Sequence, residues 1–355
     1  MRSALVILYC VLVTTVYAQW ELVQVPLTST LNSVHVLGED VAIGSAGYWL
    51  KGIDGIDWTA IPLVDNSNAP LTYLSFSSVH QHSETDLVGI GTFAGLNYVV
   101  YRSTDGGITW TNTYDQPVAL VMLTDQDWWS TQNGLAVGTN GRILHTSNGG
   151  SSWLAQNTTS VLLHDVECFS GGAIAVGESY ILRNEYPSTS WEVLEFGSAY
   201  LRSVSFVDEN IGYAAGSVLL KTVDGGSTWN EVDVAIDDFP FMYKIKFISE
   251  MEGYAVSFDR ILYTSNGGVN WEYFPVGPAL YDIDIASNGV GYAVGEDGSV
   301  YRTTSEGVYH PYAHFTASSE WICQGSLIEF VNHSAAGLSL QWYVDGELVS
   351  TGTDL

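Results

Sequence analysis

The stretch that decides the fold is Thr222-Val223-Asp224-Gly225-Gly226-Ser227-Thr228-Trp229. The same pattern recurs at 103–110, 146–153 and 264–271. An Asp or Asn side chain can accept hydrogen bonds from the backbone of its own turn, and paired glycines supply the positive φ that a tight hairpin needs. The pattern therefore predicts a structural turn between two strands, built by Asp105, Gly107, Trp110, Asn148, Gly150, Trp153, Asp224, Gly226, Trp229, Asn266, Gly268 and Trp271.

Weaker copies of this turn raise the number of repeats to seven. They end at Trp58, at Trp191, which has lost both glycines, and at His310. Successive end positions lie 38 to 52 residues apart, which is the usual length of a four-stranded propeller blade. Small and β-branched residues, as in Gly291-Tyr292-Ala293-Val294-Gly295, predict a buried strand before each turn. The sequence therefore predicts an all-β, seven-bladed propeller over residues 19–313.

The N-terminal segment Trp20–Val25 is expected to close this ring. It is similar to the strand that follows a turn, yet no turn precedes it, and no such strand follows His310. Pairing the two ends would complete the seventh blade and remove an open sheet edge.

The ends of the chain predict export and a second module. Residues 1–18 combine Met1-Arg2, an apolar run and a small residue before Gln19, which is typical of a cleaved signal peptide. No other stretch approaches the ~18 apolar residues of a membrane span, so the product is expected to be secreted or at the cell surface. Cys168 and Cys323 are expected to be buried free thiols rather than a disulfide.

The overall charge narrows the range of partners. The chain of 355 residues holds 39 acidic and 11 basic residues, a formal net charge of −28. A protein this acidic lacks the basic surface that nucleic acids require. We therefore expect no nucleic-acid partner, and we expect the propeller to be monomeric.

Two families resemble these motifs. The turns are similar to the Asp-box (BNR) repeats of sialidases, sortilin-type receptors and several secreted glycosidases. Together with the Gly-Tyr-Ala-Val-Gly strands, they resemble the photosystem II assembly and stability factors, the Ycf48-like family, over about residues 20 to 313. That resemblance implies a propeller that docks membrane-protein precursors through a basic patch, and the charge of −28 departs from it.

The last segment resembles a different domain. Residues 314–355 are similar to the first part of a PKD or Ig-like β-sandwich, and they are too few for a whole sandwich of about 100 residues. Leader, propeller and PKD-like module together resemble the secreted and surface proteins of Bacteroidetes-type bacteria.

Alternation on the innermost strands predicts the lining of a central channel. Segments such as Ser203-Val204-Ser205-Phe206 and Lys244-Ile245-Lys246-Phe247 place every second residue on the side away from the core. The residues expected there are Ser33 and His35, Tyr73 and Ser75, Asp125 and Asp127, Asp165 and Glu167, Ser203 and Ser205, Lys244 and Lys246, and Asp282 and Asp284. Six carboxylates against two lysines predict an acidic channel that either holds a cation or a cationic ligand group, or is simply wet, with its charges solvated or paired.

Other candidate sites carry less weight. His80 and His82 could bind a metal, but without a third ligand they are expected to lie in a solvated loop. Trp128 aligns with core positions and is expected to be buried. No cofactor is expected, apart from the optional cation in the channel. Four arginines are expected at one equivalent position before each turn, which indicates a repeat feature rather than the arginine cluster of a sialidase: Arg102, Arg142, Arg183 and Arg302.

Three hypotheses for function follow. The main one is a secreted or surface-displayed, non-catalytic propeller that binds a protein or glycan ligand in adhesion. The first alternative is a protein like the photosystem II assembly factors, and the second is a glycoside hydrolase or sialidase.

Overall fold

The computed structural model describes residues 8–12, 20–53, 57–94, 97–116, 122–157, 160–185, 190–235, 240–286, 288–303, 315–317, 330–332, 340–344 and 347–350. The turn expected to end at His310 lies outside these residues. So do the expected leader and PKD-like module, apart from five short strands: β1 (Leu8–Leu12), β28 (Phe315–Ala317), β29 (Phe330–Asn332), β30 (Leu340–Val344) and β31 (Glu347–Ser350). Of these, β30 pairs with β1 and β31, and β28 pairs with β29.

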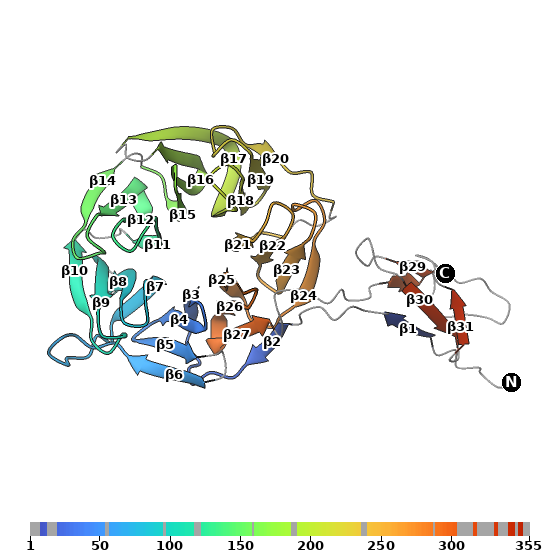
Figure 1. Cartoon of the computed structure of the whole chain (residues 1–355), viewed down its shortest axis with the longest axis horizontal. Coiled ribbons are helices and arrows are strands. Elements are labelled where there is room, and N and C mark those ends of the chain that lie inside the picture. The colour runs from blue at the N-terminus through green and yellow to red at the C-terminus, as the bar shows by residue number, and fades with distance from the viewer. Residues whose placement is uncertain are drawn as a thin grey trace.

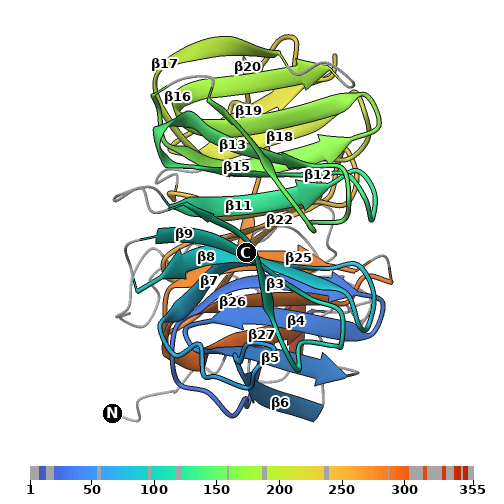
Figure 2. The same ribbon diagram turned by 90° about the vertical axis from the view of Figure 1, so that its left-hand side faces the viewer.

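The main body is a ring of β-sheets around a central channel (Figure 1), as expected for an all-β propeller. Two 3₁₀ turns, η1 (Thr139–Gly141) and η2 (Glu296–Gly298), are the helical elements within the described part of the chain. Turned by 90°, the view in Figure 2 shows the sheets stacked one upon another around the ring.

Five of the sheets have four antiparallel strands each. From the channel outward they are β3 (Leu31–Leu37), β4 (Asp40–Ser45), β5 (Tyr48–Ile53) and β6 (Asp57–Pro62); β7 (Leu74–Gln81), β8 (Leu87–Phe93), β9 (Asn97–Ser103) and β10 (Thr111–Gln116); β11 (Leu123–Trp128), β12 (Gly134–Gly138), β13 (Arg142–Thr146) and β14 (Leu154–Asn157); β21 (Lys244–Phe247), β22 (Gly253–Val256), β23 (Arg260–Thr264) and β24 (Glu272–Pro275); and β25 (Leu280–Ile285), β26 (Gly291–Gly295), β27 (Val300–Thr303) and β2 (Trp20–Val23).

The sixth sheet corrects the prediction of seven separate four-stranded sheets. It has six strands, β15 (Leu163–Phe169), β16 (Gly172–Glu185), β17 (Trp191–Phe206), β18 (Gly212–Gly216), β19 (Leu219–Thr222) and β20 (Asn230–Glu231). The fourth and fifth sequence repeats share it because β16 and β17 continue through positions where other repeats have loops. Glu178 pairs with Tyr200 at the point where the two halves meet.

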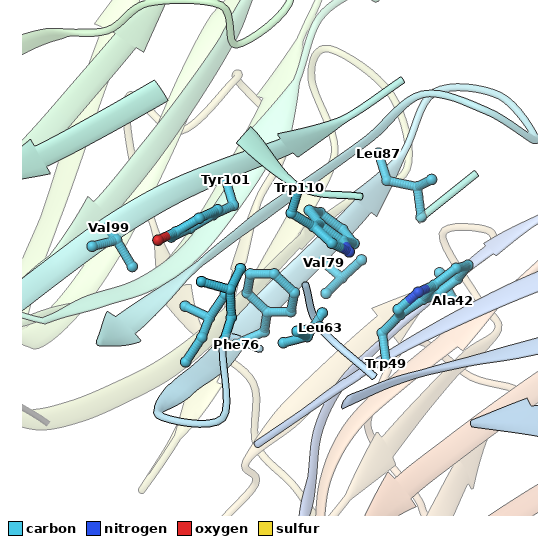
Figure 3. Packing of buried hydrophobic residues seen from close by; sticks show 11 residues of the cluster. Ala42, Trp49, Leu63, Phe76, Val79, Leu87, Val99, Tyr101 and Trp110 are labelled. Carbon is cyan, nitrogen blue, oxygen red and sulfur yellow. The ribbon is translucent and has the colours of Figure 1, made fainter. Parts of the chain in front are cut away.

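Buried aromatic and aliphatic side chains hold neighbouring sheets together. Figure 3 shows the cluster between the first two sheets, where Trp49 and Phe76 approach Trp110. The ring centroids of Phe76 and Trp110 are 4.9 Å apart, and those of Trp49 and Trp110 are 6.4 Å apart. Burial of such large rings dominates the packing energy of a core.

The repeated turns have the predicted geometry. Gly106 and Gly107 have φ of 75° and 77°. Asp105 accepts hydrogen bonds from the backbone and the hydroxyl of Thr109, at 2.9 and 2.7 Å. Gly107 also lies against the preceding sheet, where a Cβ would come within 2.2 Å of the Trp49 indole. The turn therefore closes its own hairpin and also packs against Trp49 of the preceding sheet.

The N-terminal strand closes the ring as predicted. β2 pairs with β27, with Trp20 opposite Thr303. Trp20 is only 3% exposed, and its indole contacts Tyr254 of the neighbouring sheet edge-on, with centroids 6.1 Å apart. The first strand in the ring is thus bound to the last sheet by both backbone pairing and side-chain burial.

Truncating this tryptophan tests the closure. Trp20→Ala is expected to lower the free energy of unfolding by about 3–5 kcal/mol, the usual cost of removing a buried aromatic side chain, and to speed proteolysis at the N-terminus. The control is Leu22→Ala on the same strand, because Leu22 is 54% exposed. Equal losses for both variants in urea unfolding would show that the strand does not lock the ring.

Candidate functional site

The innermost strands leave backbone groups that the sheets do not pair. Each is the edge of its sheet, so half of its N–H groups point toward the neighbouring strand without a ladder partner. Side chains of the preceding innermost strand accept these hydrogen bonds: Asp282 from Val34 at 2.8 Å, Ser33 from Val79 at 2.9 Å, Asp127 from Cys168 at 2.7 Å, Asp165 from Val204 at 2.8 Å, and Ser203 from Ile245 at 3.1 Å. Several channel residues therefore have a structural task.

One cavity of about 370 Å³ is lined by all eight charged residues that the sequence placed in the channel. We name it the acid cavity; its charged lining is Asp125, Asp127, Asp165, Glu167, Lys244, Lys246, Asp282 and Asp284.

The prediction for the second sheet was half right. Tyr73 precedes β7 and is 71% exposed, whereas Ser75 does border the channel, in a second cavity described below. Ser78 and His80 line the acid cavity in their place. The alignment slipped because β7 runs for eight residues, from Leu74 to Gln81, so its channel positions lie further along the chain.

A second layer of channel residues was missed. Six innermost strands carry a register shift, which lies near the start of the strand except in the long β17, and at each shift a β-bulge adds one residue on the channel side. With Tyr243, which precedes β21, the added residues line another cavity of about 440 Å³, here named the bulge cavity: Asn32, Ser77, Thr124, His164, Arg202, Tyr243 and Tyr281. All of them except Ser77 stand directly before a predicted channel residue, but alternation alone points such a residue into the core.

Lys244 lies where the two cavities meet. Its Nζ is 2.9 Å from Asp125 and 2.8 Å from Asp165. Burial raises the pKa of the Asp125 carboxyl well above its ordinary value. Burial acts the same way on Asp165, but the charge of Lys244 together with hydrogen bonds from Asp125, Lys244 and the Val204 backbone outweighs it and lowers the pKa of Asp165 to about 2. The protein's own ammonium group thus occupies the place between two carboxylates where a bound cation was considered.

Three further carboxyl groups of the acid cavity are harder to ionise than usual. Burial raises the pKa of Glu167 to about 8, and that of Asp127 and Asp282 to about 6. Within the described ranges, no group of three or more His, Cys, Asp or Glu residues has a geometry that could hold a metal ion.

His80 lies on β7 rather than in the predicted loop, whereas His82 follows the end of that strand, and both side chains are half-buried rather than fully solvated. His80 packs between His35 and His82, with ring centroids 4.2 and 4.8 Å away. Burial lowers the pKa of all three imidazoles, that of His82 to about 4. Trp128 is buried beside them as predicted, 4.4 Å from the His82 ring.

The prediction that the four arginines share one repeat position was wrong. Arg102 and Arg302 precede the last residue of β9 and β27, whereas Arg142 begins β13 and lies 5.5 Å over the Tyr98 ring. Arg102 pairs with Asp86 at 2.9 Å, and Arg183 with Glu185 at 2.7 Å. Arg102, Arg142 and Arg183 therefore contact residues of their own sheet or of a neighbouring sheet.

The seven residues of the bulge layer divide into two kinds. Asn32, Ser77 and Thr124 donate side-chain hydrogen bonds of 2.7 to 2.8 Å to carbonyl groups of the next innermost strand. They tie strands together. The other four are larger and face the cavity: His164, Arg202, Tyr243 and Tyr281.

An arc of aromatic rings lies beside these four larger residues. Tyr200 and Phe241 lie 5.7 Å apart, Phe241 and Tyr243 5.3 Å, and Tyr243 and Tyr281 5.8 Å. The arc ends where the Tyr281 hydroxyl donates to Glu296 at 2.7 Å, a contact that helps raise the pKa of Tyr281 to about 12. Aromatic walls with a few fixed polar groups are typical of ligand-binding cavities.

Comparisons with known proteins agree with this architecture. Residues 183–313 match the family model described as photosynthesis system II assembly factor YCF48. The chain resembles YCF48. The structure of YCF48 from Cyanidioschyzon merolae is 20% identical, with a TM-score of 0.65 over 80% of this chain and 98% of that one. A structure of YCF48 bound to D1 peptide is 18% identical, with a TM-score of 0.65 over 82% of this chain and 99% of that one.

A curated relative matches over a shorter length. The chain is 30% identical over 119 residues to photosystem II stability/assembly factor HCF136, chloroplastic, from Arabidopsis thaliana, and this covers 30% of each chain. The structure of U3-55K has a similar propeller at 7% identity, with a TM-score of 0.64 over 80% of this chain and 98% of that one. At such low identities the structural likenesses show the fold alone. Among the described residues, no helix is long and apolar enough to cross a membrane.

The pKa of Glu167 gives a test of the channel. Because the folded protein holds this proton up to about pH 8 and the unfolded chain releases it near 4.5, the contribution of Glu167 to stability is lost as pH rises through that window. Glu167→Gln keeps a neutral side chain, so its melting temperature relative to the native protein is expected to rise from pH 5 to pH 9.

The control for this experiment is Glu195→Gln, at an exposed position of β17. A difference in melting temperature that stays constant with pH for Glu167→Gln, as for the control, would contradict the assigned proton.

Proposed function

We propose that this chain is a non-catalytic, protein-binding propeller that holds a segment of a partner polypeptide in the bulge cavity. The observation that carries the proposal is this cavity of about 440 Å³, with its aromatic arc, on a ring similar to YCF48. One solved YCF48 structure has D1 peptide bound.

This proposal is closer to the assembly-factor alternative than to adhesion. Because the sequence match covers only residues 183–313, we do not carry the partner of YCF48 over to this chain. With a net charge of −28, we do not carry over the basic patch that the resemblance implied. Export through residues 1–18 and a PKD-like module at 314–355 are kept as proposals that rest on the sequence alone.

We also propose that the ring has seven repeats, with the six-stranded sheet counted as two. Ile174 and Val176 of its first half pack against Val204 and Phe206 of its second half, in the way that neighbouring sheets pack elsewhere. Among the described strands, seven border the channel, namely β3, β7, β11, β15, β17, β21 and β25.

The glycosidase alternative has less support. A sialidase needs several arginines around one substrate carboxylate. Here Arg102 and Arg183 pair with acids of their own sheets, and Arg302 donates to the Tyr292 hydroxyl at 3.0 Å.

Peptide binding tests the proposal. The full chain is screened against an array of overlapping peptides, and the variant Tyr243→Ala/Tyr281→Ala is expected to lose about tenfold or more in affinity, because buried aromatic residues contribute most of the binding energy at interfaces. The control is Tyr273→Ala on the outer strand β24, where the side chain is 44% exposed. Equal affinities for both variants, or no peptide bound by the native chain, would overturn the proposal.

A further inference from the structure

Two acids that line the bulge cavity already accept several hydrogen bonds from the protein. Asp165 accepts from Lys244 and from the backbone of Val166 and Val204. Asp282 accepts from the backbone of Val34 and Ile283. A cationic ligand group would therefore have to break existing hydrogen bonds of these buried side chains.

Arg202, by contrast, has most of its hydrogen-bond donors unused by the residues that the structure describes. A guanidinium group has five N–H donors, and in the described part of the chain Arg202 makes one side-chain hydrogen bond, from Nη1 to Nδ1 of His164. No carboxylate of the described residues forms an ion pair with it. In a protein with a net charge of −28, an unpaired arginine that lines a cavity is an open receptor for an oxyanion.

His164 holds this guanidinium in place. Since an arginine N–H can only donate, Nδ1 of His164 must accept, and Nε2 lies 2.8 Å from the Tyr200 hydroxyl. Burial and the nearby Arg202 charge lower the pKa of His164 to about 4, so the neutral ring that this arrangement needs is present at neutral pH.

The surroundings select the kind of oxyanion. The net negative charge of the chain repels small free anions, so an anion must arrive on a ligand that gains binding energy elsewhere. Tyr243 and Tyr281 line the same cavity, and Met122, which is 50% exposed, lies at its wall. Asp125, Asp165 and Lys244 line both this cavity and the acid cavity, so their ion pairs lie between the two cavities and obstruct a strand that would pass from one to the other. The end of a chain does not have to pass them.

We propose that Arg202 binds the C-terminal carboxylate of a partner polypeptide, whose last side chains contact Tyr243 and Tyr281. This inference rests on the proposed function and names the ligand group that the same cavity recognises. A carboxylate and a guanidinium form paired, charge-assisted hydrogen bonds, so the contact selects a free chain end over an amide.

Paired peptide arrays test this assignment with the full chain. Each peptide is presented with a free C-terminal carboxylate, as a C-terminal amide, and with its carboxylate moved to an internal glutamate. We expect affinity for the free acid to exceed that for the amide by about tenfold or more, since hydrogen bonds to charged groups are the stronger class. Arg202→Gln is expected to abolish this preference.

The matched control is Arg142→Gln, which removes the same charge from Arg142 at the start of β13, outside the cavity lining. It should keep the preference for the free acid. Peptides bound equally as acid and amide would overturn the carboxylate assignment and leave the proposed function standing. Preference for internal glutamate would overturn the chain-end assignment, and no binding in any form would overturn both proposals.

Discussion

A row of unpaired backbone N–H groups on each innermost strand is the constraint on which the ring depends. Sheets in a propeller do not form ladders with one another at the channel, so this row must find acceptors across a gap between strands. Serine and aspartate are short and carry oxygen acceptors, and they supply most of them here. The strand next to β25 in the ring is β21, whose Lys244 and Lys246 cannot accept hydrogen bonds. The N–H groups of Ile283 and Ile285 on β25 are instead bound at 2.9 Å by the preceding residues of their own strand, Asp282 and Asp284.

The same constraint gives the acidic residues of the channel a structural role. Most of these carboxylates accept backbone hydrogen bonds, and Lys244 joins two of them across the ring. The proposed recognition falls to the bulge layer, in which three residues tie strands together and the other four, His164, Arg202, Tyr243 and Tyr281, line the cavity. A β-bulge is a common means of re-aiming side chains near a functional site.

Much of the fold was predictable because the repeated turns carry local signals. Paired glycines and a following tryptophan mark each hairpin in sequence, and the unpaired segment at Trp20 identifies the closing strand. The six-stranded sheet was not predictable, since it arises because β17 continues as one strand from Trp191 to Phe206, and no local signal in the sequence marks that continuity. The channel charges followed from alternation along each innermost strand, except in β7, where the greater length shifted the register.

The bulge layer could not be read from alternation. A bulge reverses the inward and outward order of residues for one position, and it depends on backbone pairing with the next strand rather than on residue type. His164 and Arg202 directly precede Asp165 and Ser203 in the sequence, but nothing in the sequence indicates that they face the channel. Their chemistry emerges only when the register of the innermost strands is known.

Backbone hydrogen exchange tests the central claim most directly. In Ser203→Ala/Ser205→Ala, the acceptors for the N–H groups of Ile245 and Phe247, now at 3.1 and 3.0 Å, are removed. The account predicts that these two amides exchange about tenfold or more faster, while Val204, whose acceptor is Asp165, keeps its native rate. Unchanged exchange at Ile245 and Phe247 would contradict the claim that side chains of one innermost strand satisfy the backbone of the next.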